Sequence, residues 1–172
     1  VGDVVATDGA CTLREAIQAA NTDSAVDACA TGSGADTVIL PAGVYTLTLA
    51  GSSEDANLTG DFDITDTLTI RASAAVINAN GLDRVLHAQA GEYTVTVQGL
   101  TITNGADISG LLNAGGGARF QSHAVLSGTR FISNTAQEGG GAHFERTATL
   151  TSTEFLANVA HVHAGGAAFE GD

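Results

Sequence analysis

The chain has 172 residues, of which 44% are hydrophobic, a size at which one domain can bury its own core. Its 19 acidic residues outnumber six basic ones, all arginine, and give a formal net charge of -13. Nucleic-acid binding needs basic side chains that displace the cations condensed on phosphates, so this composition argues against DNA, RNA and anionic membrane surfaces as partners. No apolar run in the sequence is long enough to span a bilayer, so the segment is predicted not to insert into a membrane.

The N-terminal segment, residues 1–36, is predicted to be a cap that contains one short helix. In CTLREAIQAAN, Thr12 and Glu15 have the spacing of a capping box, in which the two side chains satisfy free backbone N–H groups. Apolar side chains follow at helical spacing: Leu13, Ala16, Ile17 and Ala20. We therefore predict a helix over residues 13–20, with Asn21 beginning its exit.

The two cysteines, Cys11 and Cys29, flank this helix. They are either two free, buried thiols or the two halves of a disulfide. We favour the disulfide because no histidine or further cysteine lies nearby in the sequence to complete a metal site. Disulfides persist in oxidising compartments, so the pair indicates an exported protein.

After the cap the chain consists of short segments rich in threonine and valine, separated by turn residues. The predicted strands are DTVILP, GVYTLTLAG, FDITDTLTIRA, YTVTVQGLTITNG, AVLSGTRFISN and ATLTSTEFLAN. In TLTI and TVTV the apolar residues alternate with threonine, so we expect them to face a core: Leu68, Ile70, Val95 and Val97. No long helix pattern lies between the strands, which excludes a doubly wound α/β fold and leaves a solenoid or a sandwich.

A repeat of about 24 residues decides between these two folds. Five pairs of identical residues are 24 positions apart: Phe131 and Phe155, Asn134 and Asn158, Leu126 and Leu150, Gly117 and Gly141, Phe120 and Phe144. Stacked coils of three short strands bury a face that no single coil can bury alone. We predict an all-β fold, a right-handed parallel β-helix over residues 37–172, which forms one structural domain with the cap. Residues 106–113 interrupt the repeat and are predicted to bulge as a loop.

The repeated residues are predicted to stack on neighbouring coils. Phe131 would lie over Phe155, and Asn134 and Asn158 would form an asparagine ladder, each amide bonding to backbone or to the next amide. Arg130 is followed 24 residues later by Glu154, which predicts a surface ion pair.

The repeated glycines of GGGAHF have a structural explanation in this frame. A phosphate-binding glycine loop is followed by a helix and, in nucleotide sites, by a lysine and a hydroxyl residue. Here a strand follows, and the chain contains no lysine. We therefore assign these glycines to positive φ angles and to close approach of neighbouring coils at a corner.

The motifs also resemble known bacterial families. CTLREAIQAAN is similar to the signature of exported CSLREA-domain proteins, and GADTVILPAGVYTLTLAG, GDFDITDTLTI and GLDRV resemble segments that follow it there. FISN with GGGAHF, and FLAN with GGAAF, resemble the FxxN and GGA repeats of polymorphic outer-membrane proteins. The resemblance implies a right-handed β-helix on an extracellular or cell-surface protein, often a passenger or stalk. It implies no agreed activity and no catalytic residues.

One acidic segment is a candidate metal site. EDANLTGDFDITD contains Asp61, Asp63 and Asp66, whose oxygens are the ligands that calcium prefers. Asp61 and Asp63 would share one face of an extended strand. The segment lacks the central glycine and terminal glutamate of an EF-hand, and the alternative is a solvated acidic turn. Calcium is the one cofactor that the sequence suggests.

Three histidines form a second, weaker candidate. His161 and His163 share a face at a spacing of two, and His143 would lie one coil away. No carboxylate or cysteine joins them at usual ligand spacing, so a polar exposed turn is preferred over a metal site.

Two classes of function follow. The first is a non-catalytic exported or cell-surface module, structural or adhesive, that displays a surface for a glycan or protein ligand. The sequence stops inside a repeat, so we expect either a longer protein or self-association of copies through an open C-terminal end of the solenoid.

The alternative is a carbohydrate-active enzyme, a polysaccharide lyase or a glycosidase. Two carboxylates across one groove, or calcium carboxylates with a basic residue, would be needed. The clustered candidates are Asp61, Asp63 and Asp66 with Arg71 or Arg84. Few aromatic residues are present on which sugar rings could stack.

Overall fold

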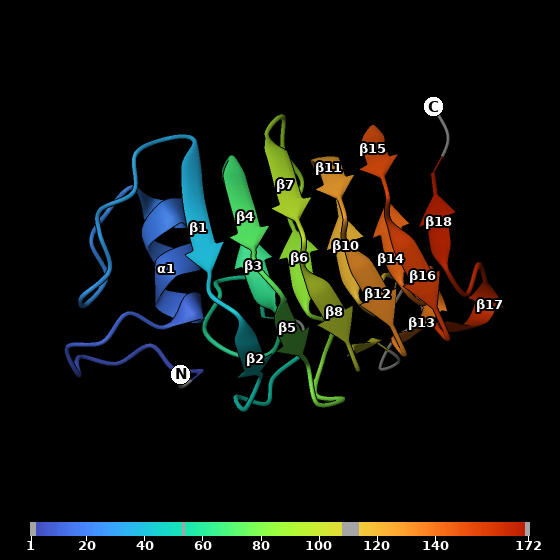
Figure 1. Ribbon diagram of the computed structural model, residues 1–172, viewed down its shortest axis with the longest axis horizontal. Helices are drawn as coiled ribbons and strands as arrows, with labels where there is room; N and C mark the ends of the chain where they lie inside the picture. Colours follow the sequence, from blue (N-terminus) through green and yellow to red (C-terminus); the bar gives the residue numbers. More distant parts are fainter. Residues whose placement is uncertain (1–2, 53, 108–113, 171–172) are drawn as a thin grey trace.

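The computed structural model is a parallel β-solenoid that begins with one helix, as the repeat predicts (Figure 1). It describes residues 3–52, 54–107 and 114–170. The chain winds through the sheets in turn, so each sheet receives one strand from each successive coil. Among the described residues, no helix is both long and apolar enough to cross a membrane.

Three sheets have five parallel strands each. Sheet A contains β1 (Asp36–Leu40), β4 (Leu68–Ala72), β7 (Thr94–Gln98), β11 (His123–Ser127) and β15 (Ala148–Thr151). Sheet B contains β2 (Gly43–Thr46), β5 (Ala75–Asn78), β8 (Thr101–Thr103), β12 (Arg130–Ile132) and β16 (Glu154–Leu156). Sheet C contains β3 (Phe62–Ile64), β6 (Leu86–Ala88), β10 (Ala118–Phe120), β14 (Ala142–Phe144) and β18 (Ala167–Phe169). A shorter sheet D contains β9 (Ala106–Asp107), β13 (Thr135–Glu138) and β17 (Val159–His163).

The 24-residue period sets the register of the last coils. Phe131 pairs with Phe155, and Leu126 pairs with Leu150. Earlier coils are longer, since Ile102 pairs with Phe131. The predicted loop over 106–113 is wrong at its start, because Ala106 and Asp107 form β9 and pair with β13; residues 108–113 lie outside the described part of the chain.

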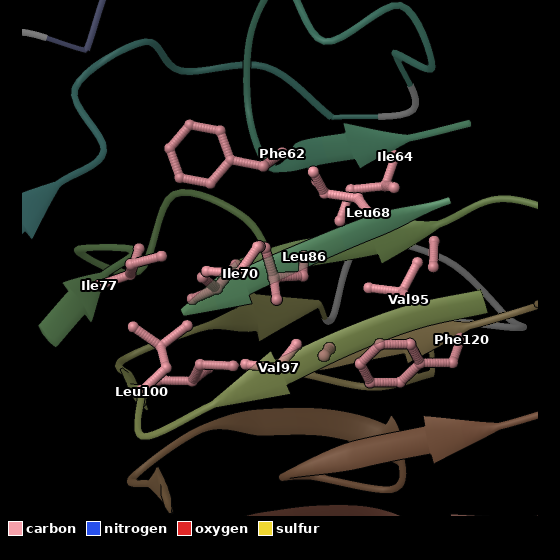
Figure 2. Close-up of a cluster of buried hydrophobic side chains, with 14 of the residues drawn as sticks. Phe62, Ile64, Leu68, Ile70, Ile77, Leu86, Val95, Val97, Leu100 and Phe120 are labelled. Atoms are coloured by element: carbon pink, nitrogen blue, oxygen red, sulfur yellow. The ribbon is translucent and has the colours of Figure 1, made fainter. Parts of the chain in front are cut away.

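The core lies inside the coils, where alternate side chains of the strands meet (Figure 2). The four residues predicted to face a core, Leu68, Ile70, Val95 and Val97, are all buried. They pack with large side chains from the other sheets, among them Phe62, Leu86 and Phe120. Burial of such side chains contributes about 1.5–3 kcal/mol each, which is why strands of three to five residues remain ordered.

Identical side chains stack from coil to coil. Phe131 and Phe155 have ring centroids 5.0 Å apart with nearly parallel planes. Asn158 Oδ1 accepts hydrogen bonds from the side-chain Nδ2 and the backbone N–H of Asn134, both at 3.0 Å. The predicted ion pair between Arg130 and Glu154 is present, with Nε and Oε2 2.7 Å apart.

The helix of the cap, α1 (Leu13–Thr22), ends two residues later than predicted. Thr12 and Glu15 form the predicted capping box at its start, and Asp23 closes it in the left-handed conformation. Asn21 does not unwind the helix, because its side chain hydrogen-bonds the backbone on both sides of Ile64 and so ties α1 to β3. Figure 1 shows α1 at one end of the stack of strands.

A buried arginine and a disulfide hold the cap in place. The Arg14 guanidinium pairs with Asp3, Nε to Oδ1 2.7 Å, and donates to the carbonyl oxygens of Gly60 and Asp61 at 2.7 and 2.9 Å. Cys11 and Cys29 are joined by a disulfide, with their Cα atoms 4.8 Å apart. Both contacts link segments that are distant in the sequence.

Candidate functional site

Polar side chains from four successive coils line up on the outer face of sheet C. The central residues of β3, β6, β10 and β14 are in register: Asp63, His87, Arg119 and His143. Neighbouring strands lie about 4.8 Å apart, so these side chains follow one another along the solenoid. Of the four, the sequence prediction included Asp63 and, within a different group, His143.

A second column runs beside the first; its residues directly follow β6, β10, β14 and β18, so it is shifted by one coil relative to the first column. It consists of Gln89, Gln121, Glu145 and Glu170, whose backbone N–H groups extend the hydrogen-bond ladder of sheet C. We call these two columns together the sheet C row. An open pocket adjoins the row at Gln121, Glu145 and Glu170, and Arg146 and His123 complete this part of its wall.

His87 is the centre of the first part of the row. Its Nδ1 lies 3.1 Å from Asp63 Oδ1 and 3.5 Å from Asp55 Oδ1, and its Nε2 lies 3.0 Å from Gln121 Oε1. Burial disfavours the charged imidazolium, but the hydrogen bonds to Asp63 and Gln121 outweigh burial and raise the pKa of His87 above its ordinary value. Asp63 is fully buried, whereas the Asp55 side chain is 67% exposed.

Arg119 and Glu145 form an ion pair in the middle of the row. The Arg119 Nε and Nη2 lie 2.7 and 2.6 Å from Glu145 Oε1, and Gln121 Nε2 donates to Glu145 Oε2 at 2.9 Å. Burial alone would raise the pKa of Glu145, but the hydrogen bonds from Gln121 and Arg119 lower it below its ordinary value. Glu145 is therefore a carboxylate at neutral pH.

His143 closes the row with an unsatisfied nitrogen. The residue is only 3% exposed, and its Nδ1 makes no hydrogen bond within the described part of the chain. Its Nε2 lies 3.5 Å from Glu170 Oε1, and its Nδ1 lies 3.9 Å from Glu145 Oε1. Imidazole and carboxylate groups at such distances are typical metal-ligand types.

A separate charged cluster lies where the chain enters sheet C. Arg84 pairs with Asp61 and Asp107, both at 2.5 Å, and all three residues are buried. Burial raises the pKa of Asp61 to about 7. The Arg84 guanidinium opposes this rise, and the negative charges of Asp83 and Asp63 add to it. Burial likewise raises the pKa of Asp83 and Asp107.

The three carboxylates predicted to hold calcium have three different environments. Asp61 pairs with Arg84, and Asp63 hydrogen-bonds His87. Asp66, partly exposed, accepts a hydrogen bond from the backbone N–H of Thr67 at 2.6 Å. Among the described residues, the cluster of possible ligand atoms that includes Asp63 draws its other members from Asp55 and His87.

The three candidate histidines are likewise separated. His161 and His163 are exposed on β17, whereas His143 is buried and forms its cluster of possible ligand atoms with Glu145 and Glu170. Glu145 and Glu170 follow Phe144 and Phe169, which pair in register, so the repeat places the two carboxylates on adjacent coils, and the sequence prediction missed them.

Arg71 and Arg84, the two arginines predicted to serve an enzyme site, lie in different parts of the solenoid. Arg71 is exposed on β4 in sheet A, where its Nε donates to Gln98 Oε1 at 3.1 Å. Arg84 is engaged by the buried Asp61 and Asp107. Asp61 is thus held inside the molecule by Arg84 and does not face Arg71 across a groove.

Fold and site together define the class of protein: a parallel β-solenoid in which the outer face of one sheet, sheet C, is polar and partly buried. Comparisons with models of protein families, with curated proteins and with solved structures find no match to the chain. The fold alone does not identify a function, so the function is inferred from the site itself.

Proposed function

We propose that the chain is a non-catalytic structural or adhesive module of an exported or cell-surface protein. One observation carries the proposal: the core pattern of the solenoid is repeated in the last coil but is not covered there. Phe144 is 1% exposed, whereas Phe169, which stacks on it in register, is 58% exposed. An apolar end of this kind suits further stacking, by another coil of the same protein or by a second copy.

Two further features support export and display. The disulfide between Cys11 and Cys29 is compatible with an oxidising compartment. The more exposed side chains of the sheet C row offer arginine, amide and carboxylate groups that suit a surface glycan or a protein ligand: Arg119, Gln121, Glu145 and Glu170. The resemblance to CSLREA-domain proteins and to polymorphic outer-membrane repeats points to the same setting.

The uncovered end can be tested with the 172-residue protein by light scattering over a range of concentrations. We expect the chain to self-associate as its concentration rises, and we expect Phe169→Glu to abolish this because it places a charge on the stacking surface. Val44→Glu is the matched control, since Val44 is 66% exposed on β2 near the other end. A protein that stays monomeric at every concentration, or one in which Phe169→Glu and Val44→Glu behave alike, would exclude association through this end.

A second candidate is the carbohydrate-active enzyme, and one observation favours it. His87, Arg119 and Glu145 bring a base, a cation and a carboxylate onto one face beside an open pocket. Product release from a panel of polysaccharides would be compared for the unchanged chain, His87→Gln and the remote control Glu154→Gln. Activity that His87→Gln removes and Glu154→Gln retains would establish the enzyme and overturn the non-catalytic proposal.

A further inference from the structure

We propose that Asp55, Asp63 and His87 form a binding site for a divalent transition-metal ion of the zinc class, at the end of the sheet C row nearest the cap. The site differs from the calcium site expected from the sequence in its ligands and in the ion that it suits. It is also independent of whether the solenoid is a structural module or an enzyme.

The spacing of the three groups fits one ion. His87 Nδ1 lies 3.1 Å from Asp63 Oδ1 and 3.5 Å from Asp55 Oδ1, and the three ligand atoms lie within 4.8 Å of one another. Zinc binds nitrogen and carboxylate oxygen at about 2.1 Å in a tetrahedron, which places neighbouring ligand atoms about 3.4 Å apart. Small side-chain movements would therefore complete three of four positions.

A chain of hydrogen bonds orients the imidazole for this role. Glu145 can only accept, so the Gln121 amide nitrogen, 2.9 Å from Glu145 Oε2, must donate to it. The Gln121 oxygen then faces His87 Nε2 at 3.0 Å, so Nε2 carries the hydrogen. In the metal-free protein the hydrogen bond to Asp63 needs a proton on Nδ1, and a metal ion that displaces this proton meets an Nδ1 lone pair that faces the two carboxylates. Metal-bound histidines characteristically donate their other N–H to an oxygen in this way.

Other hydrogen bonds hold the carboxylates. The backbone N–H of Asn57 donates to Asp63 Oδ2 at 3.0 Å, which directs the other oxygen toward His87. Gln89 Nε2 donates to the Asp55 carbonyl oxygen at 2.6 Å and to Asp63 Oδ1 at 3.3 Å, which keeps Asp55 beside the buried pair. Because the Asp55 side chain is 67% exposed, an ion can enter from solvent and keep a water as its fourth ligand.

The ligand types select the class of ion. One imidazole nitrogen with two carboxylates suits zinc and related first-row ions, whereas calcium prefers six to eight oxygen ligands and magnesium retains most of its waters. We therefore expect ZnCl₂ and CoCl₂ to bind and CaCl₂ to have no effect at this site.

The test is calorimetric titration of the untagged, metal-free 172-residue protein with ZnCl₂, together with the visible absorption of the Co²⁺ form. We expect Asp55→Asn and His87→Gln each to weaken Zn²⁺ binding at least about tenfold, the size of effect seen even for residues behind the ligands. Asp55→Asn changes an exposed side chain, and glutamine can keep the donor to Gln121 while removing Nδ1. Circular dichroism and the midpoint of thermal unfolding without metal verify that both variants fold.

Two matched controls make the result specific. Asp66→Asn removes a carboxylate of the expected calcium site and should leave Zn²⁺ binding unchanged. Glu170→Gln removes a carboxylate from the cluster of His143 and Glu145, and it should leave the Asp55 site unchanged. The proposal is overturned if no Zn²⁺ binds, if binding survives both Asp55→Asn and His87→Gln in folded protein, or if only Glu170→Gln removes it.

Discussion

The guanidinium of Arg84 serves two buried carboxylates, Asp61 and Asp107, and a third, Asp83, lies close enough to influence it. One positive charge cannot compensate three negative ones in a site with little solvent. Burial raises the pKa of Asp61 to about 7; the Arg84 guanidinium opposes this rise, and the charges of Asp83 and Asp63 add to it. Asp61, which the sequence predicts as a calcium ligand, is thus paired with Arg84 and has a raised pKa.

This cluster predicts an unusual pH dependence of stability. The unfolded chain loses the Asp61 proton near its ordinary pKa of 3.8, whereas the folded protein retains it until about pH 7. Between these values the folded state binds more protons, so the free energy of unfolding from this group falls as pH rises. Asp83 and Asp107 act in the same direction.

Urea unfolding from pH 4 to pH 8 tests this for the unchanged chain and for Asp61→Asn. The variant should show a weaker loss of stability with rising pH, whatever its absolute stability, because asparagine does not titrate. Asp66→Asn, which changes a carboxylate that lies outside the Arg84 cluster, should keep the original slope. Equal slopes for the unchanged chain and Asp61→Asn would contradict a raised pKa of Asp61 in the folded protein.

At the scale of the strand, the sequence predicts register well only where residue types repeat. Phe131 and Phe155 identify their own partners because an aromatic ring stacks on a copy of itself. Along sheet C the residue type changes at every coil, from Asp63 to His87 to Arg119. Each strand there has three residues, too few to show an alternation of polar and apolar side chains in the sequence. The fold was therefore predictable from its core, while most of the candidate site was not.

The longer early coils add a second reason. Asp36 pairs with Leu68, Leu68 with Val95 and Ile102 with Phe131, so the residues per coil change with the length of the turns. In sheet C the longer spacing lies between β6 and β10, where His87 pairs with Arg119, so the continuation of the row beyond His87 could not be inferred. Asp61 lies directly before β3 and Arg84 lies two residues before β6, and their contact is seen only when the two coils lie side by side in the structure.

Close packing of the coils predicts a strong effect of a small change at Gly141. A Cβ atom there would lie 2.5 Å from the Gly166 carbonyl oxygen and 2.7 Å from the Phe155 ring. Gly141→Ala should therefore lower the free energy of unfolding by about 1–3 kcal/mol, as overpacking does. At Gly43 the nearest atom to such a Cβ is 3.9 Å away, so Gly43→Ala should change stability by less than about 0.5 kcal/mol. Urea unfolding measures both, and equal effects would refute the role of Gly141.

For the whole molecule, stability depends on each coil and on the interfaces between neighbours. The first interface includes the cap, where Arg14 is fully buried and joins Asp3 to two carbonyl groups of the first coil. Arginine satisfies all three because its planar fork of donors is rigid. The cap thus depends on the polar contacts of one side chain, Arg14, as well as on apolar packing.

Removing that contact should weaken the whole protein. Arg14→Ala leaves the buried Asp3 carboxylate without its cation, and we expect a loss of about 3–5 kcal/mol in the free energy of unfolding. Arg14→Lys should lose less because it keeps the charge, and it remains informative if the alanine variant does not fold. Arg130→Ala, at an exposed ion pair, should lose at most about 1 kcal/mol. A small loss for both Arg14 variants would mean that packing, the disulfide and the Asn21 hydrogen bonds hold the cap without Arg14.

The two ends of the solenoid differ, because α1 lies over the first coil (Figure 1) while Phe169 is exposed on β18. If two copies of this 172-residue chain associate through β18, as proposed, both use the same surface and are related by a two-fold axis. Such an assembly closes, so light scattering should find a dimer of the chain and not a fibre.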